Sequence, residues 1–420
     1  MRFTALFLAL GCSVALAQTA SSPLSVEPKI VTVPLALDHN RVVINAEIPL
    51  PDGSTQQVRA WVDNGNPDLW MSRRVAGLMG TTIVCNGQVC SATLPNAVQG
   101  IVIAGGMKIL LPAKSEIKVP LRPPSAAAVL APGMNAEIII PSTVLRQYDV
   151  LIDFPDHKFT IGQPGTVKFR GTKTKAIVNG ENGLIEVPSQ IENKKYLLGL
   201  DIGSSFNFLS GELFDKLASA HHDWPQMTGA IGPANMWGLG DEAHWKVMRL
   251  DRVQYGPLFL TNVAVSQLPK DRAPLFESRG VASTGLLGAE ALVNYRIGID
   301  YAHSAVYFEI GRTFNFPDFD VVGLTLRPED NGSFTILAVT DYEGKASVAD
   351  VQSGDQLVAV DGIPVRGVTM GQVWLMLGGE PGKERRLTVE RDGKQFTVSA
   401  KVRHFLAEAM ENAQTKSHGN

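Results

Sequence analysis

The chain has 420 residues, of which 45% are hydrophobic and 19% are charged, and its formal net charge at pH 7 is −3. This composition is ordinary for a globular protein with room for several domains, and the slightly negative charge argues against nucleic-acid binding. Short apolar and β-branched segments, interrupted by glycine, proline and asparagine, dominate the chain, whereas helical periodicity is scarce. The predicted fold class is therefore mostly β.

The N-terminus has the pattern of a secretory signal peptide. Arg2 precedes an apolar run from Phe3 to Leu10, and Ala15-Leu16-Ala17 is a small-x-small cleavage site. The run is too short to span a bilayer comfortably, so we expect no transmembrane segment. Lipoprotein processing at Cys12 is the alternative, but the apolar run before it is short, which favours export without an anchor. The protein is predicted to be periplasmic or secreted.

One arrangement occurs twice along the chain, namely an apolar strand that ends in Asp-x-Gly. The first copy is Trp61-Val62-Asp63-Asn64-Gly65 and the second is Leu200-Asp201-Ile202-Gly203. Each copy follows a hairpin pattern and precedes a similar returning segment, at Tyr148 to Phe154 and at Tyr295 to Tyr301. Glycine allows close backbone approach at a tight turn, so this duplication predicts that the two aspartates meet across one cleft.

Two carboxylates at such short range cannot both ionise comfortably. One keeps a proton at mildly acidic pH, while the other acts as a base and activates a water molecule. The expected chemistry is hydrolysis with water as the nucleophile and without a covalent intermediate.

These segments resemble the pepsin-like and retropepsin-like aspartic proteases of the bacterial type. In that family each lobe supplies an aspartate in an Asp-Thr-Gly context, followed by a hydrophobic-hydrophobic-Gly segment. The second lobe here has Asp201 to Ser204 and then Leu286-Leu287-Gly288, and the first has Trp61 to Gly65 and then Pro67 to Trp70. The resemblance covers roughly residues 40 to 312 and implies a bilobal double β-barrel. It also implies that Asp63 and Asp201 are catalytic, in active-site loops that contain Asn64, Gly65, Asn66, Ile202, Gly203 and Ser204.

Several residues depart from the family pattern, mostly in the first lobe. The residue after each aspartate is usually a threonine whose hydroxyl helps to lock the two loops together, but here it is Asn64 or Ile202, and the Ile202 side chain forms no such bond. Ile139-Ile140-Pro141 stands where a glycine is expected, and no aromatic residue between Met71 and Gln147 is available for a flap. These departures support a second hypothesis, a catalytically inactive protease-like protein that binds peptides.

A competing interpretation comes from a different class of protein. Leu200 to Ser205 also resembles the first phosphate loop of actin-like and sugar-kinase ATPases. That loop lies near the N-terminus in those proteins, whereas here it follows a cognate copy, and the chain has no second phosphate motif. His221-His222 is more typical of a solvated loop than of a metal site. We therefore expect no nucleotide, metal or other cofactor.

Two cysteines follow the predicted signal peptide. Cys85 and Cys90 are separated by four residues that include an Asn-Gly turn. In an oxidising compartment they are predicted to form a local disulfide, and two reduced thiols are the alternative. The clearest helix of the chain is predicted over Gly211 to Ala220, directly after the second Asp motif.

The composition changes from Val321 onward, and this stretch resembles a PDZ domain. The resemblance rests on a strand at Phe334 to Val339, a Gly-Asp turn at Gly354-Asp355, an Asp-Gly turn at Asp361-Gly362 and a closing hairpin at Leu387 to Val402. It implies a first helix near Ala346 to Val351, a groove helix over Thr369 to Leu377 and a peptide ligand that adds a strand. Gly323-Leu324-Thr325-Leu326 is the best match to the loop that binds the peptide carboxylate. The alternative is that this module only packs against the lobes.

The predicted domain organisation has seven parts. They are a signal peptide (1–17), an N-terminal extension (18–40), a first protease-like lobe (41–165), a second protease-like lobe (166–312), a linker (313–320), a PDZ domain (321–405) and a polar tail (406–420). The predicted function is that of an exported aspartic endopeptidase whose partners are polypeptide substrates or peptide ligands. The sequence does not indicate an oligomeric state.

Overall fold

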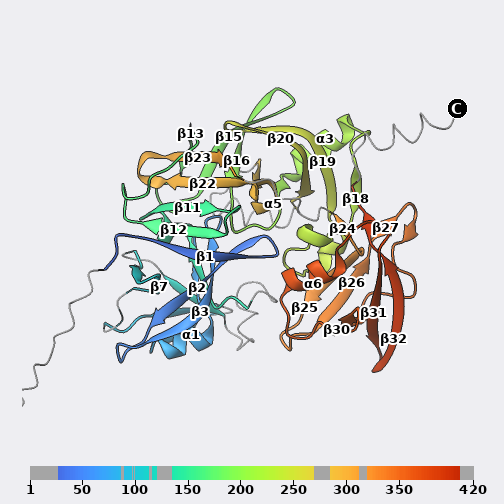
Figure 1. Cartoon of the computed structure of the whole chain (residues 1–420), viewed down its shortest axis with the longest axis horizontal. Coiled ribbons are helices and arrows are strands. Elements are labelled where there is room, and N and C mark those ends of the chain that lie inside the picture. The colour runs from blue at the N-terminus through green and yellow to red at the C-terminus, as the bar shows by residue number, and fades with distance from the viewer. Residues whose placement is uncertain are drawn as a thin grey trace, which may run out of the picture.

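The computed structural model of the chain describes residues 27–86, 89–96, 98, 100–112, 116–120, 135–268, 284–311 and 319–406 (Figure 1). Strands form most of the regular structure in these ranges, which confirms the prediction of a mostly β protein. The predicted signal peptide, most of the linker and all but the first residue of the polar tail lie outside the described residues. In the described part of the chain, no helix is long and apolar enough to cross a membrane.

An 11-stranded sheet runs through both lobes in the order β10-β3-β2-β1-β12-β11-β22-β23-β13, with β7 paired to β2 and β8 paired to β7. The lobes are joined where β11 pairs antiparallel with β22, with Leu151 opposite Gly298. Strand β1 lies inside the predicted N-terminal extension, yet it pairs with β2 and β12 and is thus an inner strand of this sheet. The bounds are β1 Ile30–Asp38, β2 Arg41–Pro49, β3 Thr55–Asp63, β7 Val102–Ala104, β8 Met107–Ile109, β10 Ile138–Pro141, β11 Asp149–Asp153, β12 Lys158–Gly162, β13 Thr172–Lys175, β22 Tyr295–Asp300 and β23 Ala305–Ile310.

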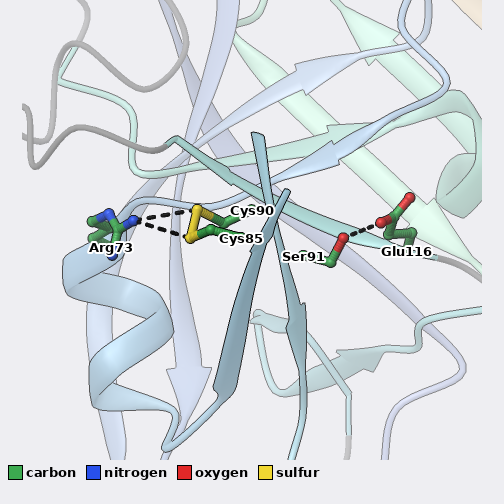
Figure 2. Close-up of a disulfide and its surroundings, with 5 residues drawn as sticks. All are labelled: Arg73, Cys85, Cys90, Ser91 and Glu116. Atoms are coloured by element: carbon green, nitrogen blue, oxygen red, sulfur yellow. Dashed lines mark hydrogen bonds between the residues drawn. A yellow bond between two sulfur atoms is a disulfide. The ribbon is translucent and has the colours of Figure 1, made fainter. Parts of the chain in front are cut away.

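A four-stranded sheet in the order β4-β9-β6-β5 and two short helices complete the first lobe. The bounds are β4 Leu69–Trp70, β5 Thr82–Asn86, β6 Val89–Thr93, β9 Ile117–Pro120, α1 Arg73–Leu78 and α2 Ser142–Leu145. Cys85 and Cys90 lie opposite each other on β5 and β6 and form a disulfide, which confirms that prediction. Arg73 on α1 donates to both sulfur atoms, at 3.6 and 3.3 Å (Figure 2). The disulfide therefore ties the hairpin to the start of the helix as well as closing its own loop.

The second lobe is built on a closed barrel of six strands. The strands β15, β16, β21, β17, β20 and β19 follow one another around it, and β15 pairs with β19 to close the ring, with β14 and β18 attached at its edges. The bounds are β14 Ile177–Val178, β15 Ile185–Ile191, β16 Lys194–Leu200, β17 Phe208–Leu209, β18 Gln226–Thr228, β19 Lys246–Tyr255, β20 Leu258–Gln267 and β21 Gly285–Leu287. Helices of this lobe are α3 Gly211–Ala220 and α5 Ala289–Leu292, with 3-10 turns η2 Gly232–Ala234, η3 Gly240–His244 and η4 Tyr301–His303. Helix α3 confirms the predicted helix, and the Ser210 hydroxyl caps it by accepting from the Leu213 N–H.

The C-terminal module has its own six-stranded sheet, in the order β25-β26-β29-β31-β32 with β30 paired to β29. The bounds are β24 Asp320–Val321, β25 Leu324–Pro328, β26 Phe334–Val339, β27 Asp341–Tyr342, β28 Lys345–Ala346, β29 Gln356–Val360, β30 Ile363–Pro364, α6 Met370–Leu377, β31 Glu384–Arg391, β32 Lys394–Lys401 and β33 Arg403–His404. Helix α6 forms where the sequence predicted a helix, over Thr369 to Leu377, and it begins with a capping box between Thr369 and Gln372. The helix expected near Ala346 to Val351 does not form, so that expectation is wrong: Ala346 ends β28, and the chain then bends into a turn in which Asp350 has a φ of +61°.

Four buried clusters of apolar side chains hold the described part of the molecule together, and three of them are large; the fourth is a small cluster of Trp61, Ala136 and Ile139 in the first lobe. Of the large clusters, one fills both lobes, one lies inside the C-terminal module, and one lies between the second lobe and the module. The cluster between them includes Phe206 and Ile231 of the lobe and Phe319, Trp374 and Phe405 of the module side. The module also contacts the first lobe, because Asp38 at the tip of the β1–β2 hairpin accepts a hydrogen bond from the Gly371 N–H on α6 at 3.1 Å. In Figure 1 the hairpin of β1 accordingly reaches toward α6.

Candidate active site

The two Asp-x-Gly segments have the same local architecture. Strand β3 ends at Asp63 beside the parallel strand β10, with Val62 opposite Ile140. Strand β16 leads to Asp201 beside the parallel strand β21, with Leu200 opposite Leu287. In each lobe the aspartate therefore leaves a strand that is held by a parallel neighbour, and a two-residue turn follows it.

The two turns approach each other so closely that only glycine fits in either of them. A Cβ atom built on Gly65 would lie 2.1 Å from the carboxyl carbon of Asp201, and one built on Gly203 would lie 2.2 Å from Oδ1 of Asp63. Each glycine is thus packed against the carboxyl group of the opposite lobe. This reciprocal contact brings the two aspartates to one place, and both line the same pocket.

Asn64 joins the two turns across the lobe boundary. Its side-chain Nδ2 donates to the carbonyl oxygen of Leu200 at 2.8 Å, and its Oδ1 accepts from the backbone N–H of Ile202 at 2.8 Å. Asn64 and Ile202 are both fully buried. The Ile202 side chain forms no hydrogen bond between the two turns, as the sequence predicted. The turns are nevertheless joined, because the side-chain amide of Asn64 both donates and accepts in the place where the family has a threonine hydroxyl.

Backbone amides orient both carboxylates. The Gly65 N–H donates to Oδ1 of Asp63 at 3.1 Å, and the Gly203 and Ser204 N–H groups both donate to Oδ1 of Asp201 at 2.9 Å. The Ser204 hydroxyl donates to the carbonyl oxygen of Phe206 at 2.7 Å. Donors aimed at a carboxylate stabilise its charged form and fix its direction.

Asn66 connects the turn after Asp63 to the segment that follows β10. Its carbonyl oxygen accepts from both the backbone N–H and the hydroxyl of Ser142, at 2.9 and 3.0 Å, and its Oδ1 accepts from the Asp68 N–H at 3.1 Å. Ser142 directly follows Pro141, which ends β10 opposite Asp63. The segment that lacks the expected glycine therefore still anchors the turn that carries Asp63.

The pocket above the aspartates has a volume of about 240 Å³ and aromatic walls. Trp61 and Trp70 come from the first lobe, and Phe208 and Trp237 from the second, where their rings stack with centroids 5.8 Å apart. Sequence reasoning recognised the first two within the motif but missed Phe208, Trp237 and the neighbouring Met236. These residues lie outside both Asp motifs, and only the fold of the 226–245 region brings Met236 and Trp237 to the pocket.

Arg41 is a second feature that sequence reasoning missed. It is only 1% exposed, its guanidinium lies 5.3 Å from the centre of the Trp61 ring, and it donates a hydrogen bond to the carbonyl oxygen of Met236. Burial lowers the pKa of Arg41 to about 10, while the negative fields of Asp38, Glu242, Asp63 and Asp201 oppose that shift. A buried cation thus lies within electrostatic reach of both candidate catalytic carboxylates.

Glu242 fixes the loop that carries Met236 and Trp237. Its carboxylate accepts from the N–H groups of Trp237 and Leu239, at 2.8 and 3.1 Å, and from the side-chain amide of Asn235. Burial raises the pKa of Glu242 to about 7, against these hydrogen bonds and the field of Arg41. This buried carboxyl group holds the residues of this loop together as one unit.

The residues predicted to bind a peptide in the C-terminal module lie away from the aspartates and face the second lobe. Leu324, Thr325 and Leu326 are 3%, 0% and 2% exposed, and Gly323 is also buried. The Thr325 hydroxyl donates to the carbonyl oxygen of Ala230 at 2.8 Å. In the arrangement described here, this edge of the module is covered by the protein's own chain.

Within the described ranges, no three His, Cys, Asp or Glu side chains are grouped in a way that could hold a metal ion. Comparison of the chain with known family models and with curated proteins finds no match. The functional argument therefore depends on the site itself.

Proposed function

We propose that the protein is an exported aspartic endopeptidase of pepsin-like architecture, in which Asp63 and Asp201 activate a water molecule and a PDZ-like module forms the C-terminal part. One observation carries this proposal. Each aspartate follows the same strand and turn, and each turn glycine packs directly on the carboxyl group of the opposite lobe. Two carboxyl groups held this way at the base of one pocket are the arrangement that general acid–base catalysis by an aspartate pair requires.

The roles of the pair follow from their shared surroundings. One carboxyl group keeps a proton and polarises the scissile carbonyl, and the other, as carboxylate, removes a proton from the attacking water. The aromatic side chains of Trp61, Trp70, Phe208 and Trp237 lower the local polarity beside the carboxyl groups, which strengthens electrostatic interactions there. The disulfide between Cys85 and Cys90 is compatible with the oxidising compartment to which the N-terminal pattern points.

A second candidate function is peptide binding without catalysis, and Arg41 is the observation that favours it. A buried cation near both aspartates favours the doubly ionised pair over the singly protonated pair that hydrolysis needs. In this case the cleft binds an extended peptide and does not cut it.

Cleavage of an unfolded protein distinguishes these two functions. The chain without its first 17 residues is incubated with casein between pH 3 and 8, beside the variants Asp63→Asn and Asp201→Asn. Asp223→Asn is the matched control, because Asp223 is exposed and lies outside the pocket. The peptidase proposal expects new peptides by mass spectrometry from the wild type and the control and none from the other variants. Absence of cleavage at every pH, with folded protein by circular dichroism, supports the binding function instead.

A further inference from the structure

Strand β25 is the edge strand of the C-terminal sheet, and its outer side contacts a segment of the second lobe. Among the described strands, β25 pairs only with β26. On its other side Thr325 donates to the Ala230 carbonyl, and the Leu326 N–H donates to Oδ1 of Asn235 at 2.8 Å. We call residues 230–237 the bridging segment; in Figure 1 it lies, in yellow-green, between the second lobe and α6. Trp374 on α6 packs against it at Gly232.

The other end of the bridging segment is a wall of the candidate active site. Met236 and Trp237 line the pocket together with Asp63 and Asp201. Arg41 donates to the Met236 carbonyl. One short stretch of chain is therefore bound at one end by the module and contributes at the other end to the cleft.

The pocket at the aspartates is small for a polypeptide substrate. Its volume of about 240 Å³ is below the roughly 300–1,000 Å³ of pockets that enclose a drug-sized ligand. A polypeptide of several residues needs more room than that. Movement of one wall of the pocket would give such a substrate this room.

The bridging segment has both room and pivots for that movement. A hollow of about 1160 Å³ lies at its junction with the module, between Trp237 on one side and Arg327 on the other. Gly229 and Gly238 flank the segment with φ values of +107° and +65°, in a region of backbone conformation that glycine adopts without strain. The remainder of the wall, on Phe208 and Trp61, belongs to the regular strands β17 and β3.

We propose that the C-terminal module keeps the cleft closed by holding the bridging segment at the edge of β25, and that an extended polypeptide bound at this edge releases the segment and opens the cleft. A peptide carbonyl replaces Oδ1 of Asn235 as the acceptor for the Leu326 N–H, as in the addition of a strand to a sheet edge. Because the segment and the peptide compete for one edge, peptide binding and opening are coupled. This inference rests on the peptidase function proposed above.

Hydrogen exchange of residues 229–240, followed by mass spectrometry, tests the coupling without any need for catalysis. The variant Thr325→Val combined with Asn235→Ala removes both hydrogen bonds to β25 together with the Asn235–Glu242 bond, and we expect exchange in this region to become about 10-fold faster or more. Thr325→Val alone leaves the Asn235–Glu242 bond intact, and it should also accelerate exchange if the contact with β25 holds the segment. Thr335→Val is the matched control, since its hydroxyl bonds only to Glu329 and Gln356 inside the module. A synthetic peptide with the sequence of residues 228–238, added to the wild type, tests the same competition without a mutation.

The results separate the two proposals. Faster exchange in the double variant and with the added peptide, but not in the control, supports the coupling, and casein cleavage by the double variant then exceeds that of the wild type. Unchanged exchange in both experiments, or equal acceleration in the control, overturns it. Faster exchange without cleavage by any form rejects the peptidase function while it supports the link between module and cleft wall.

Discussion

The link that Asn64 makes between the lobes leads to a quantitative prediction. Replacement of Asn64 by alanine removes two hydrogen bonds of 2.8 Å that are fully buried, and it leaves the Leu200 carbonyl and the Ile202 N–H without this partner. Each buried polar group that loses its partner costs about 1–3 kcal/mol. We therefore expect Asn64→Ala to lower the free energy of unfolding by about 3 kcal/mol.

Urea denaturation followed by fluorescence measures this change, with the slope of the transition compared between variants. Asn45→Ala is the matched control, because Asn45 is exposed on β2 in the same sheet, and a surface change of this kind stays within about 0.5 kcal/mol. Asn64→Thr should recover part of the loss, since a hydroxyl both donates and accepts. A free energy of unfolding for Asn64→Ala within about 0.5 kcal/mol of the wild type refutes the view that this side chain locks the lobes together.

Two further predictions concern acid stability and the turn glycines. Burial lowers the pKa of His39 to about 3, with Arg41 adding to the shift, so below pH 6.5 the unfolded chain gains a proton that the folded chain does not. The free energy of unfolding therefore falls with the pH, by about 3 kcal/mol at pH 4.5 for this one group. Asparagine tolerates the φ of +52° at position 39, so His39→Asn should remove most of this loss. Urea titrations of both proteins at pH 7 and 4.5 measure the difference. Gly203→Ala should abolish casein cleavage, because the added Cβ would meet the carboxyl group of Asp63. Gly77→Ala is the control and should leave cleavage unchanged, because no atom lies within 4 Å of its added Cβ. Equal activity of the two variants would contradict the reciprocal packing of the turns.

Periodicity and turn chemistry were sufficient to predict the β-rich class, helix α3 and the disulfide, because each depends on residues close together in the sequence. The repeat of Asp-x-Gly similarly pointed to two related turns. The expected helix after Ala346 came only from a family resemblance, and the chain forms a turn there, with Asp350 in a left-handed conformation. Local sequence carried no signal for that difference.

The parts of the site that could not be predicted are those supplied by distant segments. Arg41 lies at the start of an ordinary strand, and only the packing of the β1–β2 hairpin against the 226–245 region buries it beside the aspartates. Asn64 was identified as a departure from a pattern, but its bonds to Leu200 and Ile202 depend on the meeting of two turns far apart in sequence. Such contacts depend on long-range packing, which single-residue propensities do not report.

The contact between Asp38 and Gly371 joins positions 333 residues apart in the chain. His39, next to Asp38, has its ring edge-on to that of Trp374 on α6, with centroids 5.5 Å apart. A growing chain that lacks α6 therefore leaves this face of the first hairpin uncovered. Burial of this face must then wait until residues 370–377 of α6 have been made, and structures with contacts this distant in sequence also fold slowly. The first hairpin of the described chain is thus completed only after most of the C-terminal module is present.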